Sequence, residues 1–171
     1  MEVVKIVGVA VLAAIGYGIV HDQVTAHLCV QYFTIAHPPV FATLSPFWLA
    51  IGWGIIATWW LGLALGFALA LAARLGARPK LGLAELLPSV AMLLAVMAGS
   101  AAAAGLVGSI VAGQGIIALP PALVGAIAPD HKPACVAALL AHETSYAVAL
   151  LGGLLVVGVA WYRRGAKVRV P

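Results

Sequence analysis

The sequence predicts an all-α fold, a four-helix bundle that is integral to a membrane and forms a single domain over residues 1–171. Hydrophobic residues make up 64% of the chain and charged residues only 8%, whereas soluble proteins carry roughly 25% charged residues. The apolar residues form runs of about 20 or more, the length that crosses a bilayer as a helix. These runs do not alternate between apolar and polar residues, so helices are expected rather than strands.

The first span is expected at about residues 3–20, between Lys5 and the pair His21–Asp22. A basic start followed by an apolar run also describes a secretory signal peptide. A small-residue cleavage motif does not follow this run, so we expect an uncleaved first span. The polar segment after it, residues 21–46, is predicted to be an outer loop.

The second and third spans are expected at about residues 47–73 and 84–112. Ser45–Pro46 has the residue types preferred at a helix N-cap and first turn, which places the start of the second span. Gly62 and Gly66 in this span, and the small-residue segment 98–105 in the next, are typical of helix faces that pack closely in lipid. Besides the lipid bilayer, the predicted partners are therefore a second copy of the chain or another membrane protein.

The fourth span is expected at about residues 142–162, after an outer loop at 113–141. Trp161–Tyr162 and the arginines that follow have the composition of a membrane interface. Of the nine Lys and Arg residues, only Lys132 falls in an outer loop. The positive-inside rule therefore predicts cytoplasmic N- and C-termini and a multi-pass protein of a bacterial inner membrane. The other eight cations are Lys5, Arg74, Arg78, Lys80, Arg163, Arg164, Lys167 and Arg169.

Metal-ligating residue types gather on the predicted outer side. The pair His21–Asp22 follows the first span, and the pair His142–Glu143 begins the fourth. Ionisable groups at this depth are costly in lipid, so both pairs are expected to face the bundle interior and to converge. Imidazole and carboxylate ligands suit Zn, Fe, Mn or Cu, so the four residues predict a transition-metal site. The less favoured candidate ligands are His27, His37, His131 and Cys135.

Other interpretations of these residues stay open at this point. Histidines near an interface are often ordinary amphipathic side chains, and Cys29 and Cys135 suit either a disulfide or metal ligation. The segment His142–Tyr146 has tyrosine where the zinc-protease motif HExxH requires its second histidine, so a protease is not predicted. Enzymatic activity and substrate are not predicted.

Two further function classes compete with a metal site. In a transport or permeation subunit, the Ala/Gly-rich third span and Gln114 would line the path, and Glu85 would receive a proton on the inner side. A structural, partner-binding subunit would use the small-residue helix faces, with the histidines as a pH-sensitive interface. The low charge excludes a nucleic-acid-binding face.

Two short segments carry a resemblance. Residues 21–25 read HDQVT and residues 32–38 read YFTIAHP. This pattern, HDQ-x-T followed by YFT-x-x-HP, resembles an uncharacterised family of small four-span bacterial membrane proteins. The resemblance extends into residues 51–60 and implies a family, without an activity or a catalytic residue.

Overall fold

The computed structural model describes residues 1–166, and the regular secondary structure of that part is helical throughout. The crossing helices are α1 (Glu2–Leu28), α3 (Pro46–Ile56) followed by α4 (Trp59–Arg74), α5 (Leu83–Gly113) and α7 (Lys132–Ala166). Three short elements lie between them, α2 (Val30–Thr34), α6 (Pro121–Val124) and the 3-10 turn η1 (Pro129–His131). The predicted all-α fold with four helices able to cross a membrane is confirmed.

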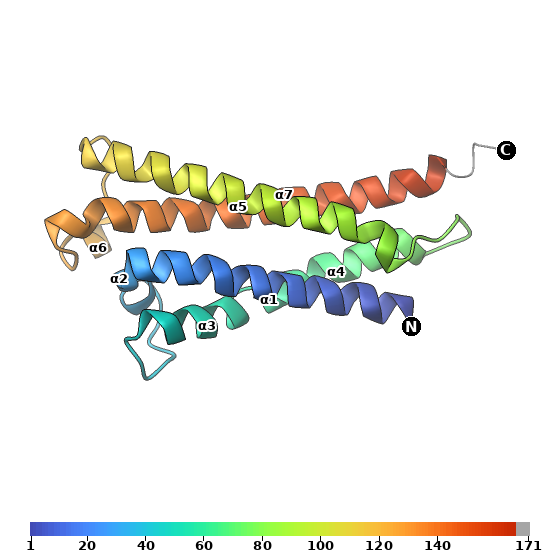
Figure 1. The fold of residues 1–171 in the computed structure, drawn as a ribbon, viewed down its shortest axis with the longest axis horizontal. Helices are drawn as coiled ribbons and strands as arrows, with labels where there is room; N and C mark the ends of the chain where they lie inside the picture. Colours follow the sequence, from blue (N-terminus) through green and yellow to red (C-terminus); the bar gives the residue numbers. More distant parts are fainter. Residues whose placement is uncertain (167–171) are drawn as a thin grey trace.

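The long helices form two pairs (Figure 1). Helix α1 packs along α3 and α4, helix α5 packs along α7, and contacts between α4 and α7 join the pairs. The N-terminus of α1 and the end of α7 lie at one end of the bundle, and the short helices α2 and α6 lie at the other (Figure 1). We refer to the end with α2 and α6 as the outer end, following the orientation that the cations predict.

The second crossing is broken, where the sequence predicted one helix over 47–73. Helix α3 ends at Ile56 and α4 starts at Trp59. The Thr58 hydroxyl donates to the Gly54 carbonyl (2.5 Å), while the Thr58 backbone amide turns to the Ile55 carbonyl (3.4 Å). A side chain therefore replaces the helical hydrogen bond that the break removes, as a membrane interior requires.

Glycines in the second crossing bring its backbone against α1. A Cβ atom on Gly62 would lie 2.7 Å from the Cβ of Ala14, and one on Gly66 would lie 2.6 Å from the Cβ of Ala10. The Gly62–Gly66 face, predicted to bind a partner, is thus occupied within the chain. In the small-residue segment of α5, a Cβ on Gly105 would likewise lie 3.3 Å from the Ala137 carbonyl oxygen of α7.

Two helices extend further outward than predicted, and this decides where the candidate residues lie. Helix α1 continues to Leu28 and α7 begins at Lys132, instead of ending and starting near residues 20 and 142. His21, Asp22 and His142 are therefore inside helices, so helical periodicity fixes the directions of their side chains.

The opposite end of the bundle is fastened by Arg164, which is fully buried. Its guanidinium donates to four backbone carbonyls at the end of α4 and in the loop after it, those of Ala72, Leu75, Arg78 and Pro79. Carbonyls at a helix C-terminus have no partner within the helix. Arg164 supplies that partner from α7 and holds the two helix pairs together at this end.

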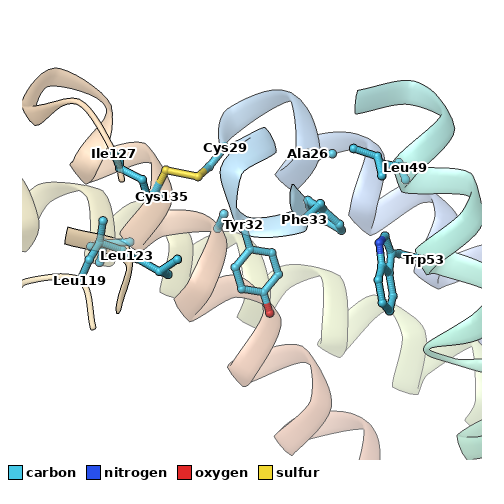
Figure 2. Packing of buried hydrophobic residues seen from close by; sticks show 13 residues of the cluster. Ala26, Cys29, Tyr32, Phe33, Leu49, Trp53, Leu119, Leu123, Ile127 and Cys135 are labelled. Atoms are coloured by element: carbon cyan, nitrogen blue, oxygen red, sulfur yellow. A yellow bond between two sulfur atoms is a disulfide. The ribbon is translucent and has the colours of Figure 1, made fainter. Parts of the chain in front are cut away.

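A disulfide between Cys29 and Cys135 closes the outer end (Figure 2). It joins the end of α1 to the first turns of α7, across 106 residues of sequence. The sequence left either a disulfide or metal ligation open for these cysteines, and in the structure they form a disulfide. Cys135 is accordingly not a metal ligand, because its sulfur is bonded to sulfur and is not a thiolate.

Candidate metal centre

His142 of α7 and Asp22 of α1 form a buried pair between the two halves of the bundle. The Nε2 atom of His142 lies 3.0 Å from Oδ1 of Asp22, and both side chains are only 7% exposed. The Nδ1 atom lies 3.1 Å from the Ala138 carbonyl oxygen. A carbonyl only accepts, so Nδ1 carries the hydrogen and Nε2 is the atom directed at Asp22. Histidines that bind metals show this arrangement, with one ring nitrogen bonded to a backbone carbonyl and the other facing the ion.

His21 completes the group. Its Nε2 atom is buried and has no hydrogen-bond partner among the described residues. The ligand atoms of His21, Asp22 and His142 all lie within 4.8 Å of one another. Ligands of a tetrahedral ion with bonds of about 2.1 Å are about 3.4 Å apart. Side-chain shifts of little more than about 1 Å would therefore bring the three atoms to coordinating distance.

Aromatic rings from α2 and the following loop cover the outer side of this group. The ring of Tyr32 lies 4.6 Å from that of His142, and the ring of Phe33 lies 5.5 Å from it. His37 packs on Tyr32 at 4.8 Å and donates from Nδ1 to the Tyr32 carbonyl. The two segments HDQVT and YFTIAHP, separate in the sequence, thus meet at one place. Figure 2 shows Tyr32 and Phe33 beside the disulfide that holds α2 against α7.

The Tyr32 side chain in this aromatic cover is uncharged at neutral pH. Burial raises the pKa of the Tyr32 phenol above its usual value, and the carboxylate of Glu143 and the phenol of Tyr146 raise it further. A neutral phenol with an aromatic ring excludes water from the His–Asp pair without adding charge.

Along α7, the group lies one hydrocarbon thickness away from the aromatic pair Trp161–Tyr162. From His142 to Tyr162 is 20 residues of continuous helix, which is about 30 Å at 1.5 Å per residue. That length is the thickness of the hydrocarbon core. The distance along α7 between His142 and the Trp161–Tyr162 pair therefore matches the separation of the two interfaces of a bilayer.

The remaining predicted ligands do not join the group. Glu143 is exposed on α7, because consecutive helical residues point about 100° apart and His142 faces inward. His27 is exposed and its Nδ1 bonds the Gln23 carbonyl (2.7 Å), while His131 is exposed beside Asp130 (3.7 Å). His37 faces the aromatic rings described above.

Two residues near the group were not predicted. The hydroxyls of Tyr17 and Ser145 form a hydrogen bond of 2.5 Å, and the ring of Tyr17 stacks on that of His21 at 5.7 Å. Tyr17 lies one helical turn before His21, and Ser145 lies one turn after His142. Residues three or four apart lie on the same face of a helix, so this spacing from His21 and His142 would have indicated Tyr17 and Ser145 in the sequence.

A cavity lies between the helix pairs and reaches this group. It encloses about 870 Å³ of empty space, its open side included, and its walls come from α1, α4, α5 and α7. We call it the central cavity. A second hollow on the outer half, with about 1130 Å³ of empty space when its open side is included, shares Tyr17 and His21 with it, so the Tyr17–His21 ring pair lies between the two.

The two residues predicted for a transport path lie elsewhere. Glu85 accepts a hydrogen bond from the Gly82 amide (2.9 Å) and caps the start of α5. Gln114 follows the last residue of α5 and is exposed. Neither side chain lines the central cavity.

Comparison with known proteins gave no match, whether with protein-family models, with curated proteins or with solved structures.

Proposed function

We propose that the protein binds a divalent transition-metal ion through His21, Asp22 and His142, at the outer boundary of a bacterial inner membrane, with both termini cytoplasmic. The observation that carries the proposal is the buried, unpartnered Nε2 atom of His21 beside the His142–Asp22 pair. An unpartnered buried nitrogen costs about 1–3 kcal/mol. A metal ion that uses its lone pair removes this cost.

The types of ligand atom limit which metal ions the site can bind. Two imidazole nitrogens and one carboxylate oxygen suit Zn²⁺, Fe²⁺, Mn²⁺ or Cu²⁺. Three protein ligands leave at least one coordination position for water or another molecule, as in sites that do chemistry rather than hold structure. His21, Asp22 and His142 all line the central cavity, so a molecule in the cavity could reach a bound ion.

Metal binding would change one hydrogen bond. With Nδ1 of His142 donating to Ala138, a single proton lies between His142 Nε2 and Asp22 Oδ1. The ion takes the place of that proton, so its uptake releases a proton. The hydrogen bond to Ala138 persists and keeps the imidazole oriented.

The HDQVT and YFTIAHP segments extend the proposal. The first supplies two ligands, and the second supplies the rings that cover them. We therefore propose that membrane proteins sharing both segments form one family with the same site.

Elemental analysis of the purified protein tests the proposal. The protein is stripped with a chelator, reloaded separately with each of the four metals, and analysed for bound metal per chain. Close to one equivalent is expected for the wild type and for His131→Gln, a control at an exposed histidine.

The variants Asp22→Asn and His21→Leu are expected to lose the metal. The amide introduced by Asp22→Asn keeps a hydrogen-bonding group toward His142, so a loss there reflects the missing carboxylate and not a collapsed fold. Failure of the wild type to take up any of the metals, or unchanged uptake in both variants, would overturn the proposal.

A further inference from the structure

The central cavity is polar at one end only. The polar side chains in its wall gather around the candidate metal centre, and the wall below them is formed by small and aliphatic residues down to Leu69, Val90 and Val156. Lys and Arg are missing from its lining among the described residues. The polar lining residues are Tyr17, His21, Asp22, Thr58, His142, Ser145 and Tyr146.

The dimensions fit one lipid chain. The wall runs along α7 from His142 to Val156 and along α1 from Asp22 back to Ala10. At 1.5 Å per residue these stretches are about 21 and 18 Å long. Half of the hydrocarbon core is about 15 Å thick, which is the extent of one lipid chain in its leaflet.

The cavity is accessible from the side of the bundle. Helix α1 packs mainly on α3 and α4, and α5 packs mainly on α7. Helices α1 and α5 therefore make few contacts with each other, and the two pairs are open between them. Leu61, Leu93 and Leu94 in the wall are only half-buried. A molecule dissolved in the bilayer can enter by this route without crossing water.

We propose that the central cavity binds a single-chain lipid that has an uncharged oxygen headgroup, such as a long-chain alcohol or an isoprenoid quinone. The chain lies along the aliphatic wall, and the headgroup oxygen hydrogen-bonds to Tyr17, Ser145 or His21. This inference goes beyond the metal site and holds for the metal-free protein, since these hydrogen-bonding groups belong to the chain.

The charge of the site selects the headgroup. A phosphate or a fatty-acid carboxylate at this end would meet Asp22 and no lysine or arginine in the described lining. An unpaired charge in a water-poor site is strongly disfavoured. A hydroxyl or carbonyl oxygen requires only hydrogen-bonding partners, which Tyr17 and Ser145 supply.

Photolabelling of the chelator-treated protein in lipid nanodiscs tests this inference, independently of metal binding. The probe is a long-chain primary alcohol with a diazirine in the middle of its chain, and the labelled residues are identified by mass spectrometry. Labelling is expected on aliphatic residues of α4 and α5 in the cavity wall. Excess unlabelled alcohol and an isoprenoid quinone are added in separate arms, and the stronger competitor identifies the source of the headgroup.

Matched variants locate the binding. Ala13→Phe places a ring in the cavity wall, whereas Leu12→Phe adds one at a neighbouring residue that is 70% exposed. We expect Ala13→Phe to reduce saturable labelling at least about tenfold and Leu12→Phe to leave it unchanged. Tyr17→Phe fills the same space without the hydroxyl, and it should weaken binding about tenfold, the value of one hydrogen bond.

Three results would overturn the inference. The first is labelling that neither the unlabelled alcohol nor the quinone reduces. The second is equal labelling of Ala13→Phe and Leu12→Phe. The third is stronger competition by a fatty acid or an anionic phospholipid than by either uncharged lipid. If Ala13→Phe does not fold, the Tyr17→Phe measurement decides, because an undiminished affinity there contradicts the placement of the headgroup.

Discussion

The substitution His21→Leu separates metal binding from ordinary packing because its effect on stability should change sign when metal is added. In the metal-free protein, leucine removes a buried nitrogen without a partner, a gain of about 1–3 kcal/mol. It also loses ring contacts with Tyr17 and His142, worth about 0.5–1.5 kcal/mol. The free energy of unfolding of the metal-free variant should therefore lie between about 0.5 kcal/mol below and about 2.5 kcal/mol above that of the wild type.

Added metal changes this comparison of stabilities. An ion present at about a hundredfold excess over its Kd stabilises the wild type by about 2.7 kcal/mol and the variant not at all. The wild type should then be the more stable protein.

The free energy of unfolding would be measured by denaturing-detergent titration, with the protein stripped of metal and again with the metal it takes up best. Val20→Leu is the control, since Val20 is adjacent in sequence and 68% exposed; it should follow the wild type in both conditions. The reasoning fails if His21→Leu costs more than about 1 kcal/mol without metal, because the nitrogen must then have a partner. It fails equally if metal stabilises both proteins to the same extent, because the ion then binds elsewhere.

Three further predictions use the same unfolding measurement. Arg164→Lys should cost at least about 2 kcal/mol, because lysine cannot donate to the four carbonyls that the buried guanidinium holds; Arg163→Lys, at an exposed neighbour, should cost less than about 1 kcal/mol. Gly18→Ala should cost about 1–3 kcal/mol, because its Cβ would lie 2.6 Å from the Gly54 carbonyl oxygen. At Gly16 a Cβ meets nothing within 4 Å, so Gly16→Ala should be neutral or stabilising by up to about 1 kcal/mol. Reduction of the disulfide should lower stability by at most about 4.7 kcal/mol, the chain-entropy limit for a loop of roughly 100 residues; no loss at all would mean that the bond does not form in the protein.

Part of the candidate site could be predicted because charged and imidazole groups are rare in an apolar chain. His21–Asp22 and His142–Glu143 interrupt long hydrophobic runs at similar distances from the membrane boundary, which favoured their convergence. Which member of each pair faces inward could not be predicted. The choice between His142 and Glu143 depends on the rotation of α7, and that rotation is set by its packing on α5 and by the disulfide at Cys135.

Composition and hydropathy alone predicted four helices able to cross a membrane, because a helix satisfies its own backbone hydrogen bonds in lipid. The sequence also determined the residue types available for a site at one end. The tertiary structure decided the break at Thr58, the internal use of the Gly62–Gly66 face and the exclusion of Glu143 from the site. It also decided the pairing of Asp22 with His142 across 120 residues. Each of these depends on how far one helix is rotated and shifted against another, a quantity that contacts distant in sequence determine and that local composition does not encode.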